Sequence, residues 1–219
     1  MVDIKALIFD LDGVVVDTAK YHYLAWKKLA EELGFFFSEK DNERLKGVSR
    51  IRSLEILLEV GGIELDEKKK VDLATKKNDD YLEYIMKMSP CEILPGVLDI
   101  LEAAKQKGLK LAIGSASKNA VTILKRVDLL KYFDAIIDGN KVSKAKPDPE
   151  VFLNAAKELG VKPEECVVFE DAEAGVEAAL NGNLHVVGIG DQNTLNKAEM
   201  VVSGFKNVNL EKFLKLGFN

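Results

Sequence analysis

The stretch Lys5-Ala6-Leu7-Ile8-Phe9-Asp10-Leu11-Asp12-Gly13-Val14-Val15-Val16-Asp17-Thr18 carries the strongest information about the fold of this chain. The apolar run Ala6–Phe9 predicts a buried strand that ends on two carboxylates spaced i and i+2, on one side of an extended chain. Two acids that face each other repel unless a cation or a proton lies between them. The simplest use of the pair is one carboxylate as metal ligand and nucleophile, and the other as proton donor and acceptor.

Short apolar runs recur along the rest of the chain and alternate with helical patterns. Most of the runs are nearly continuous, as expected for strands buried on both faces. The alternation predicts an α/β fold with a Rossmann-type parallel sheet, and left-handed helix caps are expected at Gly108, Gly160 and Gly182. The further strands are expected at Lys110–Ile113, Ala135–Ile137, Val167–Phe169, Val186–Ile189 and Met200–Val202, and the helices at Val97–Lys107, Ala120–Leu130, Pro149–Leu159 and Ala174–Asn181.

The region from about Thr18 to Met88 has a different pattern, without a convincing strand. Apolar residues at helical spacing predict only helices there, so this region is expected to form an all-helical cap inserted after the first strand. We therefore expect a catalytic core of residues 1–15 and 91–219 and a cap domain of residues 16–90. The four helices are expected at Thr18–Leu33, Glu39–Leu45, Arg50–Val60 and Asp66–Met88.

The composition sets ordinary bounds. The chain has 219 residues, 47% hydrophobic and 31% charged, with a formal net charge of -5, which is typical of a soluble cytoplasmic protein. No secretory signal pattern or membrane-spanning apolar run is found, and the acidic balance argues against nucleic acid as a partner. Cys91 and Cys166 match no metal or redox spacing and are expected to be buried thiols. We expect a monomer.

The carboxyl ends of the predicted strands collect polar side chains. In open parallel sheets ligands bind at these ends. Besides the first acid pair, they carry the small-residue turn Gly114–Asn119, Lys146 and the second acid pair Glu170-Asp171. The turn offers hydroxyl and N–H groups to an anion, and so many hard oxygen ligands suit Mg²⁺ together with a substrate phosphate.

Each of these features also has a plainer interpretation. Ser115 and Ser117 could cap the following helix, Lys146 could be a surface lysine, and Glu170-Asp171 could be the acidic first turn of a helix. Their common position at strand ends, in this order, favours one shared site.

The motifs also carry a family resemblance. Asp10-x-Asp12-Gly13-Val14-x-x-Asp17-Thr18, Ser115, Lys146-Pro147 and Glu170-Asp171 resemble the four ordered motifs of the haloacid dehalogenase superfamily. A closer similarity, to the β-phosphoglucomutases, extends over nearly the whole chain. It is carried by Asp17-Thr18-Ala19-x-Tyr21-His22-x-x-Ala25-Trp26-Lys27, Leu45–Arg50, Lys77-Asn78-Asp79, Ser115–Asn119 and Tyr132–Ala135.

The resemblance implies a role for each matching residue. Asp10 would become an aspartyl phosphate, Asp12 would exchange a proton with the sugar oxygen, and Ser115 and Lys146 would assist catalysis. Mg²⁺ would be held by Asp10, the main-chain carbonyl of Asp12, Asp171 and Glu170, the last directly or through water. The implied substrate contacts are the main chain of Leu11 and Ala116 together with His22, Trp26, Lys46, Gly47, Val48, Arg50, Lys77, Ser117, Lys118 and Asn119. Two of these have plainer interpretations as well, because a lone helix histidine usually packs or faces solvent and Trp26 fits the core of the cap.

Three functions remain open at this point. The resemblance favours an isomerase that interconverts β-D-glucose 1-phosphate and D-glucose 6-phosphate through β-D-glucose 1,6-bisphosphate. The alternative is a Mg²⁺-dependent phosphatase acting on a small sugar phosphate, in which water accepts the phosphoryl group. A non-catalytic binding protein is the third, and the intact set of acids argues against it. Arg50 and Lys118 favour the mutase, because a phosphatase needs no clamp for a second phosphate.

Overall fold

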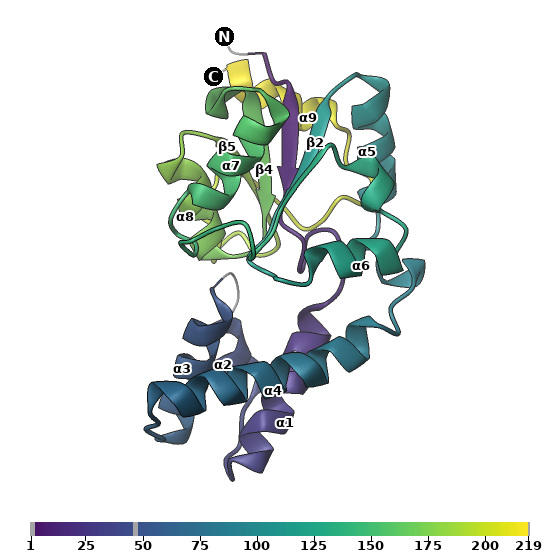
Figure 1. Ribbon diagram of the computed structural model, residues 1–219. Helices are drawn as coiled ribbons and strands as arrows, with labels where there is room; N and C mark the ends of the chain where they lie inside the picture. Colours follow the sequence, from purple (N-terminus) through teal and green to yellow (C-terminus); the bar gives the residue numbers. More distant parts are fainter. Residues whose placement is uncertain (1–2, 46–47, 219) are drawn as a thin grey trace.

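The computed structural model describes residues 3–45 and 48–218 (Figure 1). Its centre is a six-stranded parallel sheet with the strand order β3-β2-β1-β4-β5-β6, which confirms the predicted α/β fold. β1 lies between β2 and β4, so the residue that follows it, Asp10, emerges in the middle of the sheet edge. The strands are β1 (Ala6–Phe9), β2 (Lys110–Gly114), β3 (Ala135–Ile137), β4 (Cys166–Glu170), β5 (His185–Ile189) and β6 (Met200–Val202).

Helices cover both faces of the sheet. Leu7 and Phe9 of β1 pack into one apolar cluster, with helices α5, α6 and α9, whereas Ala6 and Ile8 pack into a second one, with α7 and α8. All four residues are fully buried, which explains why the strand reads as a continuous apolar run. These helices are α5 (Val97–Gln106), α6 (Ala120–Arg126), α7 (Glu150–Leu159), α8 (Glu173–Asn181) and α9 (Glu211–Leu214), with short 3₁₀ turns at Pro90–Glu92, Leu130–Tyr132, Pro163–Glu165 and Lys215–Phe218.

The other helices form a separate group at the far end of the molecule (Figure 1). This helical unit consists of α1 (Ala19–Glu32), α2 (Glu39–Glu43), α3 (Arg50–Gly61) and α4 (Glu67–Ile85). It has an apolar cluster of its own, built around Trp26, Leu29 and Leu57. Ser38, Ser49 and Asp66 cap the N-termini of α2, α3 and α4 by accepting a hydrogen bond from a backbone N–H of the first turn.

Two linkers join the helical unit to the sheet, and they run side by side. The backbone N–H of Asp17 donates to the Glu92 carbonyl at 2.9 Å, and that of Leu94 donates to the Val15 carbonyl at 3.0 Å. The hydroxyl of Tyr21 on α1 donates to the Glu92 carboxylate, which ties the first helix to the second linker. The chain therefore enters and leaves the helical unit at one place.

Several helix ends differ from expectation by a few residues, and two of them have a clear cause in the backbone. The helix expected at Ala120–Leu130 ends at Arg126, because Asp128 adopts a left-handed conformation with φ 58°. The left-handed caps expected at Gly108 and Gly160 are present, but Gly182 has φ -90° and Asn183 takes the left-handed position instead. Asparagine tolerates this conformation better than most residues, and so the turn closes one residue later than expected.

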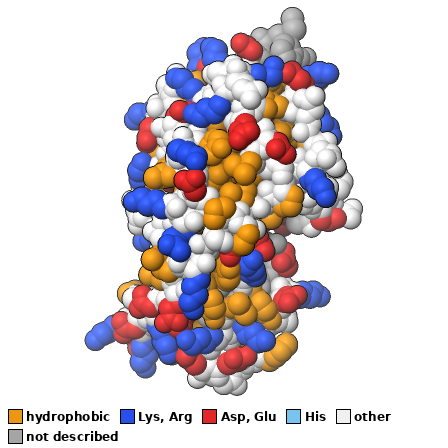
Figure 2. All heavy atoms as spheres, turned by 90° about the vertical axis from the view of Figure 1, so that its right-hand side faces the viewer, with side chains coloured by type: hydrophobic (Ala, Val, Ile, Leu, Met, Phe, Trp, Pro, Cys, Tyr) orange, Lys and Arg blue, Asp and Glu red, His pale blue; other side chains and the backbone are white. Residues whose placement is uncertain are grey.

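The surface also corrects one expectation. Cys166 is buried as expected, but Cys91 is exposed, because the linker that carries it runs over the surface. On the face in Figure 2, Lys and Arg side chains are mixed with Asp and Glu, without a continuous basic stripe. In the part of the chain that the structure describes, no helix is both long and apolar enough to cross a membrane.

Candidate active site

A cavity of about 310 Å³ lies between the carboxyl ends of the strands and the helical unit. It brings together predicted residues from both: Asp10, Asp12, Ser115, Ala116, Ser117, Lys118, Asn119, Lys146 and Asp171 from the sheet side, and His22, Trp26, Val48, Arg50 and Lys77 from the helical unit. Leu11 and Glu170 are buried behind the cavity wall. Lys46 and Gly47 lie outside the described residues, so their predicted contacts stay predictions.

Asp10 is held on both carboxylate oxygens at the end of β1. Its Oδ2 accepts a hydrogen bond from the Asp12 backbone N–H at 3.0 Å, and its Oδ1 accepts one from the Lys146 ammonium. The same ammonium donates to Glu170 at 2.8 Å. Lys146 is only 4% exposed, so the interpretation as a surface lysine is wrong. Burial lowers its pKa, but Asp10 and Glu170 outweigh burial and raise the pKa above the ordinary lysine value, which keeps Lys146 charged.

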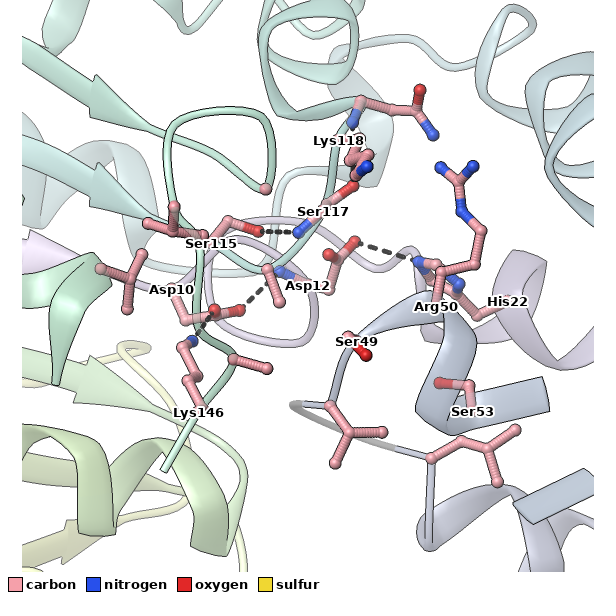
Figure 3. Close-up of a pocket in the computed structure, with 18 of the residues that line it drawn as sticks. Asp10, Asp12, His22, Ser49, Arg50, Ser53, Ser115, Ser117, Lys118 and Lys146 are labelled. Carbon is pink, nitrogen blue, oxygen red and sulfur yellow. Dashed lines mark hydrogen bonds and ion pairs between the residues drawn. The ribbon is translucent and has the colours of Figure 1, made fainter. Parts of the chain in front are cut away.

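Asp12 faces the helical unit rather than the sheet. Its Oδ1 accepts a hydrogen bond from the Thr18 hydroxyl and lies 3.8 Å from Nε2 of His22 (Figure 3). Burial, followed by the neighbouring charge of Asp10, raises the pKa of Asp12 to about 6. A carboxyl group with a pKa near neutrality can both give and take a proton at physiological pH.

The second acid pair completes a cluster of three carboxylates. Oxygens of Asp10, Glu170 and Asp171 lie within 4.8 Å of one another. Glu170 is the last residue of β4, and α8 begins only at Glu173, so the interpretation of this pair as the first turn of a helix is wrong. Burial and the charge of Asp10 raise the pKa of Glu170 to about 8, although Lys146 acts in the opposite direction. A further positive charge beside these oxygens would favour the ionised form of Glu170.

Two glycines make room for these carboxylates. A Cβ atom on Gly13, which has φ +84°, would lie 2.3 Å from Oδ2 of Asp171. A Cβ atom on Gly175, in the first turn of α8, would lie 2.0 Å from Cδ of Glu170. Gly13 belongs to the first motif, but the sequence analysis missed Gly175. Its signal was a glycine inside a helical pattern, where glycine is unfavourable without a packing reason.

The turn after β2 is held by its own side chains. Ser115 Oγ accepts from the Ser117 N–H at 3.0 Å, and Ser117 Oγ accepts from the Asn119 N–H at 3.2 Å. The N-cap residue of α6 is Asn119, which makes no side-chain capping bond, so the interpretation of the serines as helix caps is wrong. Asn119 donates instead to Asn78 on α4 at 3.0 Å, which joins the turn to the helical unit.

A stack of aromatic and basic side chains forms part of the helical wall. The Lys77 ammonium lies 2.9 Å from Nδ1 of His22 and 4.5 and 4.7 Å from the ring centres of Trp26 and Tyr81. The His22 ring stacks on Tyr81, a residue that the sequence analysis missed, with the ring centres 4.1 Å apart. Burial, followed by the charge of Arg50, lowers the pKa of Lys77 to about 7. Burial, followed by Lys77, holds the pKa of His22 well below its usual value.

Two cations stand at the other end of the cavity. Arg50, the first residue of α3, and Lys118 lie on the far side of Asp12 from Asp10 and Lys146 (Figure 3). Neither forms an ion pair with a carboxylate among the described residues. Burial lowers the pKa of the half-buried Arg50 guanidinium, which shows that its charge is partly desolvated. A desolvated cation without a carboxylate partner is well placed to bind an anionic ligand.

Comparison with known proteins identifies the family. The sequence profile of the haloacid dehalogenase-like hydrolases matches residues 4–183. A β-phosphoglucomutase of Bacillus subtilis is 43% identical over 209 residues, which is 94% of this chain and 92% of the relative. A phosphatase of phosphorylated carbohydrates from Thermotoga maritima is 38% identical over 184 residues, 82% of each chain.

Solved structures agree with the sequence comparison. The crystal structure of a β-phosphoglucomutase from Clostridium difficile superposes with a TM-score of 0.93 at 41% identity, and the match covers 98% of this chain and 97% of the other. Sequence profile, relatives and fold point to the same group. The chain belongs to the haloacid dehalogenase-like hydrolase family.

Proposed function

We propose that this chain is a β-phosphoglucomutase, an isomerase that interconverts β-D-glucose 1-phosphate and D-glucose 6-phosphate through β-D-glucose 1,6-bisphosphate. The observation that carries the proposal is a cavity with two cationic ends. Lys146 stands beside the Asp10 carboxylate at one end, and Arg50 and Lys118 stand at the other. A sugar that carries two phosphates would engage both ends at once. The relatives named mutases in two bacteria support this assignment.

Asp10 would be the nucleophile. An oxygen of the Asp10 carboxylate attacks phosphorus, the bond from phosphorus to the sugar oxygen breaks, and an aspartyl phosphate forms. Lys146, Ser115 and the N–H groups of the turn at Ala116 would hold the transferring oxygens. In the opposite half-reaction, a hydroxyl of the sugar monophosphate attacks the aspartyl phosphate and regenerates the bisphosphate. The bisphosphate must then turn end for end, so each of its phosphates binds in turn at Asp10 and at Arg50.

Asp12 would move the proton. Its carboxyl group gives a proton to the leaving sugar oxygen in one half-reaction and takes one from the attacking hydroxyl in the other. The raised pKa of Asp12, about 6, suits a group that must act in both directions. Thr18, which donates to the Asp12 carboxylate, would keep it oriented toward the cavity.

The acid cluster fits a divalent cation. Three carboxylates within 4.8 Å of one another offer the hard oxygen ligands that Mg²⁺ prefers, and their excess negative charge needs an opposite charge. Asp10, the Asp12 carbonyl, Asp171 and Glu170 would hold the ion, the last directly or through water. When bound, Mg²⁺ would offset negative charge on the transferring phosphoryl group.

We further propose that residues 16–90 act as a cap domain over a core of residues 1–15 and 91–219. Movement about the paired linkers near Val15–Asp17 and Ser89–Glu92 would bring Arg50 to the distal phosphate and exclude water from the aspartyl phosphate. Exclusion of water is what would separate a mutase from a phosphatase with the same nucleophile. The monomeric state and the cytoplasmic location stay predictions.

The test compares Arg50→Ala with Arg52→Ala. Arg52 lies two residues along α3, is exposed and pairs with Glu55 and Glu59 outside the cavity, which makes it a matched control. For wild type and both variants, conversion of β-D-glucose 1-phosphate is measured beside phosphate release. We expect Arg50→Ala to lower mutase turnover by about a hundredfold or more, since a charged hydrogen-bonded contact is lost, with much less effect on phosphate release. Arg52→Ala should resemble wild type.

Two results would contradict the proposal. If the wild type mainly releases phosphate from hexose phosphates and Arg50→Ala leaves the ratio of the two activities unchanged, the chain is a phosphatase. If Arg52→Ala lowers the ratio as strongly as Arg50→Ala, the effect arises from the helix and not from a clamp on the distal phosphate.

A further inference from the structure

A polar side chain without a partner lies in the wall of the cavity, on α2. Asn42 is 8% exposed, and its side-chain Oδ1 is shielded from solvent and accepts no hydrogen bond. Its NH₂ group makes no hydrogen bond with a described residue either. Because a buried polar group that is left unpaired destabilises a protein, nearly all such groups in folded chains have a partner. The Asn42 amide is therefore left without a partner among the described residues.

Asn42 differs in its position from the other described residues that have a buried side-chain atom without a hydrogen-bond partner. Among the described residues, two more buried polar side-chain atoms have no partner, Oδ2 of Asp80 and the hydroxyl of Tyr81. Neither residue lines the cavity, and the other carboxylate oxygen of Asp80 accepts from Lys28. Asn42 does line it, as do Leu45, Val48 and Ser53. Asn42 therefore belongs to the wall of the space in which substrate would bind, and its amide has no partner among the described residues.

The chemistry of this wall favours a neutral hydroxyl as the partner. The two phosphates of a bisphosphate already have cations, Lys146 at one end of the cavity and Arg50 with Lys118 at the other. The helical side of the cavity also carries apolar side chains, among them Leu45 and Trp26. An amide in an apolar wall offers one acceptor and two donors, which match the hydroxyl groups of a sugar ring whose C–H faces pack on apolar surface.

We propose that Asn42 is a specificity-determining residue that hydrogen-bonds a ring hydroxyl of the sugar bound between the two phosphate sites. This inference rests on the proposed function, because it takes a hexose phosphate as the ligand. Binding gives the Asn42 amide a hydrogen-bond partner. A sugar that lacks the matching hydroxyl leaves this amide unpaired and therefore binds more weakly. Asn42 would thereby discriminate between sugar phosphates that bind equally well to the two phosphate sites.

The experiment uses the full-length chain with D-glucose 6-phosphate and its 2-, 3- and 4-deoxy analogues. Dissociation constants are measured by calorimetry and kcat/KM by following the isomerisation. In wild type we expect one analogue to lose about tenfold in affinity and in kcat/KM relative to the parent sugar. In Asn42→Ala the affinity and kcat/KM for the parent sugar should fall by a similar factor. The values for that analogue should stay close to those of wild type. Asn42→Leu, which fills the volume without polar atoms, should give the same pattern.

The control perturbs the same helix without touching the cavity. Ser38 accepts the N-terminal hydrogen bond of α2 and does not line the cavity. Ser38→Ala should lower the thermal unfolding temperature by a few degrees and leave the selectivity among the four sugars unchanged.

The outcomes separate the two proposals. If Asn42→Ala and Asn42→Leu weaken all four sugars equally, or lower only thermal stability as Ser38→Ala does, Asn42 has a structural role and the inference is overturned. A wild type that binds D-glucose 6-phosphate without isomerising it would contradict the proposed function, while the dissociation constants would still decide whether Asn42 contacts the sugar.

Discussion

At the scale of single residues, the chemistry depends on one carboxylate whose two oxygens are already fixed. Asp10 accepts from the Asp12 N–H on one oxygen and from Lys146 on the other. Asn has the same shape, but its neutral amide attacks phosphorus very poorly. We predict that Asp10→Asn keeps the fold and lowers turnover by at least about a thousandfold. Initial rates, with circular dichroism as the check on folding, measure this. Substantial mutase activity in a pure sample would refute the assignment of Asp10 as nucleophile.

The buried lysine of the helical wall predicts a pH-dependent stability. Lys77 is 3% exposed, with His22, Arg50, Tyr81 and Asp12 as the titratable groups that affect it or face it. Its pKa of about 7 in the folded chain lies below the ordinary lysine value, so the unfolded chain binds the proton more strongly. The cost of burying Lys77 is therefore complete below pH 7 and declines as pH rises toward the ordinary lysine pKa.

We predict that Lys77→Met is more stable than wild type at pH 6.5, by on the order of 2 kcal/mol, although it loses activity. This advantage should shrink steadily as pH rises to 9.5. Urea unfolding of both proteins across this range gives the difference directly, because contributions from all other groups largely cancel. An advantage that does not change with pH would show that Lys77 stays charged in the folded chain.

At the scale of elements, α8 carries Gly175 in its first turn because the end of β4 needs the space. In most helices Gly→Ala stabilises by about 1 kcal/mol. In α8 the new methyl group would collide with Glu170, which Lys146 and the Ala172 N–H hold in place. We predict that Gly175→Ala lowers the unfolding temperature and raises the Mg²⁺ concentration needed for activity.

A double-mutant cycle separates this collision from a general effect on the helix. In the background of Glu170→Ala the space is open, and Gly175→Ala should then be neutral or stabilising. If Gly175→Ala costs the same in both backgrounds, the glycine serves the helix and not the carboxylate.

The strands and their ends could be read from the sequence because they depend on local patterns. The run Ala6–Phe9 is buried on both faces, and the acids that follow it lie where every parallel sheet presents its ligands. Gly175, Tyr81 and Asn42 could not be found in this way. Each reaches the site through the packing of elements that are distant in sequence, and no local pattern marks a partner across the cavity.

At the scale of the whole molecule, the cavity lies between the sheet and a helical unit that has an apolar cluster of its own, while Ala25, Tyr81 and Ile85 of that unit join the cluster of the sheet. The proposed closure brings the sheet and the helical unit together around a bisphosphate, so we predict that the radius of gyration falls when a non-transferable glucose bisphosphate analogue binds. X-ray scattering with and without the analogue measures the change. Arg50→Ala should contract less at saturating ligand, and Arg52→Ala should contract as wild type does. An unchanged radius in wild type with ligand bound would argue against closure.

The paired linkers have a consequence for how such a chain can be rebuilt. Asp17 and Glu92 are joined by a backbone hydrogen bond, so the two cut ends would already be neighbours if everything between them were removed. The path of the sheet does not depend on what is spliced in at that point. A helical unit taken from a relative with another sugar preference could be grafted there, provided that it keeps a hydroxyl at position 18 to donate to Asp12. Selectivity and phosphoryl chemistry could then be exchanged as separate modules.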